Sequence, residues 1–366
     1  MTSKNRYGVV NVVWGTEFTR LMADVTLPTN LSDGNLPALS RAADVTYHIH
    51  CTRESEVMLR DSAIFPKLAD TVAVEFHTIE SEDFFGSRSQ HALLTDRHRH
   101  AVAIAQRRDE TLIILAPDAI WSDGSFLRMH ELAHDGARAV MMAVPRATKS
   151  SFLAALETKF PEDISSGVTL DNRTIMLLLL ENLHICANNH IWREERLTSW
   201  PSQLLWRVGR EGLLVRAFHL HPVLIRPTLW DGAMPGTIDG EYVANAIQET
   251  SEIYVVRDSD EIAGVEISAS IEGNVHRSTP NTDSGTKRVA AWMRRSTNSL
   301  HRQYVRNMIR LHANEIDPAC ETLWNAAEEA SNAVLDRVNH DYARLERPGV
   351  NPNDSGSLAG TVNYAS

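Results

Sequence analysis

The sequence of 366 residues contains only three cysteines, and Cys51, Cys186 and Cys320 lie far apart. An odd number of widely spaced cysteines excludes a disulfide framework and a clustered zinc site, and it fits a reducing compartment. Long apolar runs are also lacking, because the most apolar stretch, IMLLLLENL at 175–183, is far too short to span a bilayer. The N-terminal MTSKNRYG carries no apolar signal region. We therefore expect a cytoplasmic protein with no transmembrane segment.

Positive charge is scarce, since 36 Lys and Arg stand against 47 Asp and Glu and give a formal net charge of −11. A general nucleic-acid binder would present a basic face, so we expect no nucleic-acid partner. A small anionic ligand would need a local cation, either a bound metal or an arginine cluster. No GxGxxG follows the first predicted strand and no GxxxxGK[ST] occurs anywhere. Rossmann and P-loop interpretations therefore lack their fingerprints.

What the first 150 residues do contain is an alternation of short β-rich runs with helical stretches. The predicted strands are 7–15, 43–52, 72–79, 111–118 and 137–146, and the predicted helices are 54–70, 88–108 and 122–136. Strands separated by helices of this length predict an α/β fold with a mostly parallel, mixed sheet flanked by helices. Ligands of such sheets bind beyond the carboxyl ends of the strands.

The rest of the chain changes character three times, being helical to about 198, β-rich from 203 to 270 and helical again from 286 to 345. We divide the whole chain into an α/β half at 1–150, a second half at 151–285, added C-terminal helices at 286–347 and a flexible tail at 348–366. The C-terminal helices either pair with a second subunit, giving a homo-oligomer, or wrap the core.

Two strand ends in the first half carry candidate binding residues. The strand TLIILAPD runs into Asp118, where α/β proteins place ligand-binding carboxylates, whereas Asp123 suits the N-cap of the next helix. The first strand ends in Trp14 and Gly15, an aromatic that could hold a flat base and a glycine that lets a backbone come close to a ligand. Trp14 suits a core position equally well.

Two histidines, His219 and His221, stand one residue apart in the apolar run LVRAFHLHPVLIRP. On a strand they would share one face about 6.6 Å apart, close enough for both imidazoles to reach one ion. A carboxylate would have to join them, and Asp118 is the most economical candidate. Such a ligand set suits Mn²⁺, Fe²⁺ or Zn²⁺ better than Mg²⁺. The alternative is that one histidine satisfies a core hydrogen bond while the other packs beside Pro222.

Further acids follow in the second half. The glycine-containing loop at 228–247 could cover a pocket and deliver Asp239 into it, although Asp239 could also cap a helix. The strand IYVVRDSDE ends in Asp258 and Asp260, which could bind a metal, act as a base or form a solvated turn.

The segment RMHELAH matches the H-E-x-x-H spacing of zinc proteases with His130, Glu131 and His134. Its helix is short, however, and is typical of a crossover connection between parallel strands. A metal-dependent hydrolase built on this motif, or on His219 and His221, remains an alternative. A non-catalytic ligand-binding or scaffold protein that assembles through the C-terminal helices is another.

Taken together, the layout of residues 5 to 270 resembles nucleotide-sugar glycosyltransferases of the GT-A type. The resemblance lies in the first strand ending in VVWG, the central strand ending in IILAPD, and a second half with FHLHP and a carboxylate-bearing loop. Such enzymes hold a divalent cation, Mn²⁺ or Mg²⁺, through an Asp-x-Asp at the end of the central strand. The corresponding triplet here is Ala116-Pro117-Asp118, in which only the last acid is present.

The resemblance implies an enzyme that moves a sugar from a nucleotide-sugar donor to a hydroxyl acceptor with the help of a divalent metal. It makes residues 1–150 the nucleotide-binding half and residues 151–285 the acceptor or catalytic half, and it assigns three roles to single residues. The expected metal ligands are Asp118, His219 and His221, the expected nucleotide-binding residues are Trp14, Gly15 and Arg146, and the expected catalytic acids are Asp239, Asp258 and Asp260.

Overall fold

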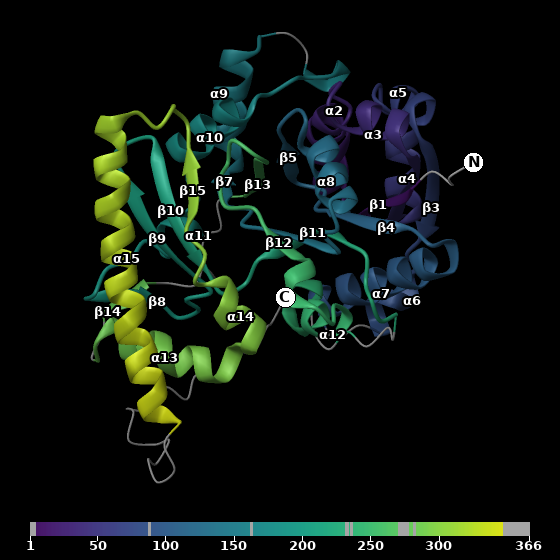
Figure 1. Ribbon diagram of the computed structural model, residues 1–366. Coiled ribbons are helices and arrows are strands. Elements are labelled where there is room, and N and C mark those ends of the chain that lie inside the picture. Colours follow the sequence, from purple (N-terminus) through teal and green to yellow (C-terminus); the bar gives the residue numbers. More distant parts are fainter. Residues whose placement is uncertain are drawn as a thin grey trace.

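The computed structural model describes residues 5–86, 89–161, 164–230, 234, 237–269, 278–280 and 283–346 (Figure 1). The strands of these residues are β1 (Arg6–Val13), β2 (Asp44–Cys51), β3 (Ala73–Thr78), β4 (Thr111–Leu115), β5 (Ala119–Trp121), β6 (Ala139–Met142), β7 (Arg146–Thr148), β8 (Arg196–Thr198), β9 (Gln203–Val208), β10 (Gly212–Ala217), β11 (His221–Ile225), β12 (Ile253–Val255), β13 (Gly264–Ser268), β14 (Ser278–Pro280) and β15 (Ile309–His312).

The helices include short irregular turns beside regular α-helices. They are α1 (Thr16–Leu21), η1 (Met22–Thr26), α2 (Leu27–Asn30), α3 (Leu36–Ala42), α4 (Arg53–Arg60), α5 (Phe65–Thr71), α6 (Ser81–Gly86), α7 (Gln90–Arg108), α8 (Ser125–His134), α9 (Lys149–Lys159), η2 (Ile164–Ser166), α10 (Asn172–Glu181), α11 (Ile185–Asn188), η3 (Ile238–Tyr242), α12 (Val243–Ala246), η4 (Thr250–Glu252), α13 (Gly285–Ser296), α14 (Ser299–Tyr304) and α15 (Pro318–Leu345). No helix of the described residues is long and apolar enough to cross a membrane.

A seven-stranded sheet in the order β12-β6-β11-β4-β1-β2-β3 forms the centre of the fold. β1, β2, β3 and β4 are parallel, whereas β11 runs antiparallel to its neighbours β4 and β6. The predicted mostly parallel, mixed sheet is therefore confirmed. Two of its strands, β11 and β12, come from the second half of the chain, so both halves share one sheet. The functional division at residue 150 stays a prediction.

Helices cover both faces of this sheet, as the apolar runs of its strands require. On one face α3, α4, α5 and α8 pack a core that includes Leu39, Leu59 and Phe126. On the other face α7 packs against the same strands, with Leu93 and Ala105 in the core. Figure 1 shows α3, α5 and α8 on one side of β1 and β4, with α7 on the other.

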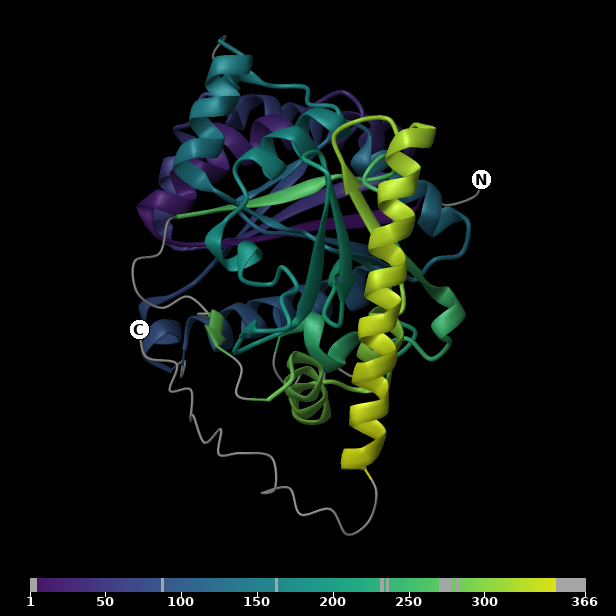
Figure 2. The same cartoon turned by 90° about the vertical axis from the view of Figure 1, so that its left-hand side faces the viewer.

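A second layer contains the three-stranded sheet β15-β10-β9, covered by α13 and α15. The long helix α15, yellow in Figure 2, runs along one side of the molecule and buries Trp324 and Val338 beneath it. It also binds Arg216 of β10, which is almost fully buried and donates to the Ser331 hydroxyl from Nε and Nη2 at 3.0 and 2.9 Å. The C-terminal helices thus wrap the core of their own chain.

The structure corrects three expectations about secondary structure. The run LVRAFHLHPVLIRP is not one strand, because β10 ends at Ala217 and β11 begins at His221 in a different sheet. The predicted helix at 54–70 is broken between α4 and α5, and the helical region after 286 also contains β15. The predicted tail at 348–366 and residues 231–233, 235 and 236 of the predicted loop at 228–247 lie outside the described residues.

Candidate functional site

The carboxyl ends of β1 and β4 are locked together by a buried polar network. The two strands pair in parallel with Asn11 opposite Leu115, and the Asn11 amide donates to the Leu115 carbonyl at 2.9 Å. The Tyr47 hydroxyl in turn donates to the Asn11 side-chain carbonyl. Buried polar groups that are fully satisfied in this way rigidify their surroundings. Trp14 and Asp118, each three residues beyond the paired positions, therefore leave the sheet from a fixed edge.

The turn that carries Asp118 is held from two sides. Its backbone carbonyl accepts a hydrogen bond of 2.9 Å from Ile267 N in β13, and the Pro117 carbonyl accepts one of 2.8 Å from the Thr26 hydroxyl. Asp123, predicted as a helix cap, has another partner, because its carboxylate accepts from Gly34 N at 2.7 Å while Gly124 occupies the N-cap position of α8.

Asp118, Arg146 and Glu266 form what we call the carboxylate–arginine cluster. Glu266 lies in β13 between β5 and β7, opposite Ala119 and Arg146. Arg146 Nε lies 2.9 Å from Glu266 Oε2. Burial and, to a smaller extent, the Glu266 charge raise the pKa of Asp118 from 3.8 to about 7, although Arg146 opposes both. Just beyond the carboxyl end of the central strand, one guanidinium thus pairs with Glu266 and acts electrostatically on Asp118.

The loop after β1 reaches the same part of the molecule. Gly15 adopts a φ of 78°, which only glycine tolerates easily, and no atom lies within 4 Å of where its Cβ would be. Glu17, two residues further, forms an ion pair with Lys149 at the start of α9, directly after β7. Trp14 is half-buried beside Phe84, with ring centroids 6.0 Å apart. The three predicted nucleotide-binding residues thus lie on segments that meet at this edge of the sheet.

Asp258 and Asp260 come together in a second place, beyond the end of β12. Asp258 Oδ1 lies 2.9 Å from His312 Nε2 and accepts from Asp260 N at 2.8 Å. These contacts outweigh burial and hold the pKa of Asp258 below its usual value. Asp260 forms an ion pair of 3.0 Å with Arg173. Asp258 is therefore ionised and paired with an imidazole, while the charge of Asp260 is already compensated.

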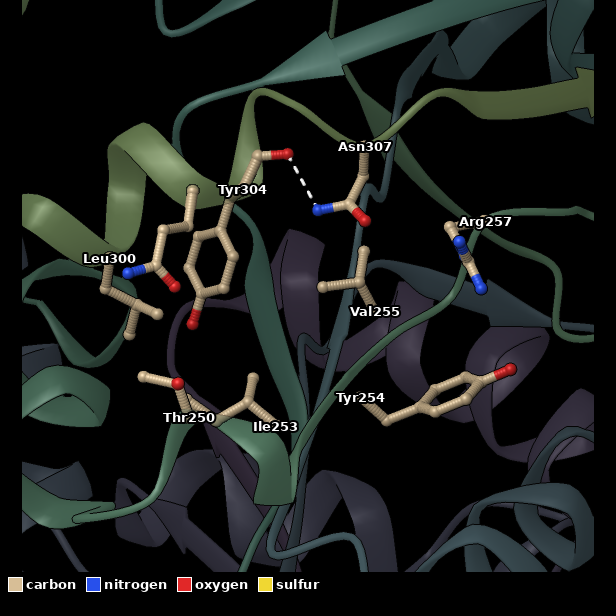
Figure 3. A pocket seen from close by; sticks show the side chains of 9 residues that line it. Thr250, Ile253, Tyr254, Val255, Arg257, Leu300, Tyr304 and Asn307 are labelled. Carbon is tan, nitrogen blue, oxygen red and sulfur yellow. Dashed lines mark hydrogen bonds between the residues drawn. The ribbon is translucent and has the colours of Figure 1, made fainter.

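An open pocket of about 310 Å³ lies between β12 and α14, and Arg257 is one of the residues that line it. Figure 3 shows Tyr254 and Arg257 on one side of it and Leu300, Tyr304 and Asn307 facing them. Arg257 directly precedes Asp258, and it is exposed, with no carboxylate within 4.0 Å of its guanidinium among the residues that the structure describes.

The two histidines of FHLHP are separated by the break between β10 and β11. His219 Nε2 lies 3.2 Å from the Ser296 carbonyl, whereas His221 Nε2 lies 3.1 Å from the Ile114 carbonyl. Asp239 lies in η3 and is not its N-cap, which is Thr237. The Asp239 carboxylate raises the pKa of His219, although burial outweighs this and keeps that pKa below the usual value.

Within the described residues, two groups of side chains place three ligand atoms within 4.8 Å of one another. They are His48, Glu75 and His77, and Asp258, Asp260 and His312. Neither group contains the predicted ligands Asp118, His219 and His221 or the histidines of H-E-L-A-H.

The residues of H-E-L-A-H have other partners. His130 Nδ1 lies 3.0 Å from the Tyr7 hydroxyl, and Glu131 pairs with Arg128 at 3.0 Å. His134 is exposed at the end of α8. The arrangement gives no support to the zinc-protease alternative.

Comparison with known proteins finds solved structures that are similar to part of this chain only. No family model matches the chain, and no curated protein matches it in sequence. Among solved structures, the chain is similar to mouse xyloside xylosyltransferase 1, with 14% identity over 43% of this chain and 59% of that one and a TM-score of 0.28. It is also similar to the Saccharomyces cerevisiae mannosyltransferase Ktr4p in complex with GDP, with 11% identity over 44% of this chain and 46% of that one and a TM-score of 0.23.

Both solved structures are glycosyltransferases, the class that the sequence layout resembles. The chain spans about half of their length, and similarity at these TM-scores assigns neither a family nor an activity. The function must therefore be argued from the residues of this chain.

Sequence reasoning missed three residues that shape these sites. Glu266 is the one charged residue of the apolar strand GVEIS, a signal that could have marked it as functional. Lys149 could have been found as the second cation, beside Arg146, on the segment after the strand at 137–146. His312 carries no local signal, because its partner Asp258 lies 54 residues away.

Proposed function

We propose that the protein is a glycosyltransferase that moves a sugar from a nucleotide-sugar donor to a hydroxyl acceptor. The observation that carries this proposal is the carboxylate–arginine cluster beyond the end of β4, next to the loop that follows β1. Open α/β sheets bind ligands at this edge. Side chains at this edge could bind the base, the phosphates and a cation.

The diphosphate of the donor would be recognised by Arg146, and Lys149 is the second cation beside it. The guanidinium is half-exposed and bonded to Glu266 through Nε, so its other nitrogens remain available for a planar, bidentate contact with phosphate oxygens. Gly15 leaves open space next to Trp14, which offers an apolar surface for a base.

Asp118 and Glu266 would hold the divalent cation. The Asp118 carboxyl resists ionisation first because it is buried and second because the Glu266 carboxylate lies nearby, and the single guanidinium of Arg146 offsets these effects only in part. Carboxylate oxygens are ligands that Mn²⁺ and Mg²⁺ accept, and phosphate oxygens of the donor would complete the shell. The bound ion would neutralise charge that develops on the leaving diphosphate. The assignment of His219 and His221 as further ligands stays a prediction.

On the acceptor side we propose Asp258 as the base for the hydroxyl group. It is ionised, its orientation is fixed by His312, and it directly follows Arg257, which lines the open pocket beside β12. Asp260 is neutralised by Arg173 and would act by keeping Asp258 in place through its backbone N–H. Asp239 would instead tune the neighbouring histidines. A cytoplasmic location stays a prediction, consistent with three free cysteines.

The test is a thermal-shift series with UDP, GDP, CDP and CMP, each with and without Mn²⁺. A ligand at 100 times its dissociation constant stabilises the native state by about 2.7 kcal/mol, which raises Tm measurably. We expect one nucleoside diphosphate to raise Tm, and Mn²⁺ to increase that shift in the wild type but not in Asp118→Asn. Asp44→Asn, which removes an exposed acid at the start of β2, is the control.

The alternatives predict other results. A scaffold protein would respond to no nucleotide, and that outcome would refute the proposal. A hydrolase built on H-E-L-A-H would lose its metal when His130 or His134 is replaced by Ala. The proposed transferase would keep the same response to Mn²⁺ in both variants.

A further inference from the structure

A histidine cluster lies on β2, β3 and α7, away from the residues proposed for the transferase. β2 and β3 pair in parallel with His48 opposite Glu75 and His50 opposite His77. Side chains at these positions point to the same face of the sheet, the one covered by α7. His100 of α7 completes the cluster, with its ring centroid 5.5 Å from that of His77.

Three ligand atoms converge at the centre of this cluster. His48 Nδ1 lies 3.0 Å from His77 Nε2 and 3.7 Å from Glu75 Oε2. Around a tetrahedral zinc ion with bonds of about 2.0–2.1 Å to nitrogen, neighbouring ligand atoms lie about 3.4 Å apart. The observed separations bracket this value. A small shift of the side chains would therefore accommodate the ion.

The surroundings orient two of these ligands. Glu110 is buried, and its Oε2 lies 3.2 Å from His48 Nε2 and accepts a hydrogen bond from it. The lone pair of His48 Nδ1 therefore points at Glu75 and His77. A carboxylate behind a ligating histidine fixes the tautomer and raises the basicity of the ligand. Arg108 donates two hydrogen bonds to Glu75, at 2.8 and 2.9 Å, and holds that carboxylate in place.

His50, which is not one of these ligands, packs directly against His77. It is fully buried, stacked on His77 with ring centroids 4.5 Å apart, and neither of its ring nitrogens has a hydrogen-bond partner. A buried polar group without a partner is costly and calls for an explanation. Gly8 leaves the space that Glu110 and His48 occupy, since a Cβ at this position would lie 3.0 Å from Glu110 Oε2 and 3.1 Å from His48.

We propose that His48, Glu75 and His77 bind a first-row transition metal ion, with Zn²⁺ as the best match. Two imidazoles and one carboxylate suit Zn²⁺ in tetrahedral geometry, and water or His100 would supply the fourth ligand. The ion would tie the edge strand β3 to β2 and, through His100, to α7. This site is separate from the carboxylate–arginine cluster and does not depend on the proposed transferase activity.

The test is Zn²⁺ binding by the full chain, measured by competition with a chromophoric chelator. We expect one tight site in the wild type. Glu110→Gln should weaken it by about 10–100-fold, the usual effect of losing the group behind a ligand, and His77→Gln should weaken it further. His134→Gln, at an exposed histidine, and Asp258→Asn, in the other three-ligand group, should bind as the wild type does.

A spectroscopic readout separates a ligand from a merely structural residue. Co²⁺ bound to His77→Cys should show a near-ultraviolet thiolate-to-cobalt band, because thiolate is a good ligand for such ions. His134→Cys should show none. Three results would each overturn the proposal. They are the absence of a tight Zn²⁺ site in the wild type, the loss of that site in Asp258→Asn but not in His77→Gln, and the absence of the cobalt band in His77→Cys.

Discussion

Replacing Asp118 by Asn probes the electrostatics of the carboxylate–arginine cluster. The folded protein keeps the Asp118 proton up to about pH 7, whereas the unfolded chain loses it near pH 3.8. The unfolded state therefore binds fewer protons between these values, and the Asp118 contribution to stability falls as pH rises through this window. Each pH unit corresponds to about 1.4 kcal/mol, which gives a limit of about 4 kcal/mol. Partial solvent exposure reduces this to about 2 kcal/mol.

Asn is similar in shape and cannot ionise, so Asp118→Asn should match the wild type at pH 4 and be about 2 kcal/mol more stable at pH 8. The measurement is urea-induced unfolding at pH 4, 5, 6, 7 and 8, with the chelator EDTA present. Asp44→Asn should show no such pH-dependent difference. A constant difference at all pH values, or a less stable Asp118→Asn at pH 8, would show that Asp118 is not held neutral by its surroundings.

Three further predictions concern other parts of the molecule. Arg146→Gln should weaken nucleoside diphosphate binding by about tenfold or more in titration calorimetry, because a charge-assisted contact is lost, while Arg41→Gln on the exposed face of α3 should not. Arg216→Lys should lower the free energy of unfolding by about 1–3 kcal/mol, seen as a lower urea midpoint, because lysine cannot reproduce the forked contact with the Ser331 hydroxyl. Burial lowers the pKa of His50 to about 2, so the unfolded state gains a proton first as pH falls below about 6.5. The contribution of His50 to the free energy of unfolding should then drop by up to about 2 kcal/mol by pH 5, and His50→Leu should remove this loss. If the free energy of unfolding of His50→Leu depends on pH as that of the wild type does, His50 is not buried as a neutral ring.

The sheet could be predicted from the sequence because its signal is local. Apolar runs such as TLIILAPD and ARAVMMAVPR predict buried strands, and the helices between such runs predict that neighbouring strands are parallel. The antiparallel insertion of β11 between β4 and β6 could not be predicted in the same way. β11 begins more than 70 residues after β6 in the sequence, and tertiary packing decides that it pairs with β4 and β6.

The positions of Trp14 and Asp118 just beyond β1 and β4 could be predicted from the sequence, whereas their roles in binding stay predictions. His312 could not be predicted because its partner Asp258 lies 54 residues away, whereas Glu266 carries a local signal but its neighbours Asp118 and Arg146 come from distant segments. The H-x-H pattern shows the limit of a local signal. It occurs in FHLHP, where β10 has ended before His219 and β11 begins only at His221. It occurs again in YHIHC, where a continuous strand keeps His48 and His50 on one face beside β3.

The most direct test of the proposed function is a crystal structure of the protein with Mn²⁺ and the nucleoside diphosphate that gives the largest thermal shift, with the ion located by anomalous scattering. We predict an anomalous peak in direct contact with the Asp118 carboxylate and a phosphate oxygen, with Arg146 bound to the diphosphate. A nucleotide bound elsewhere, or Mn²⁺ found only at Asp258 and His312, would contradict the account.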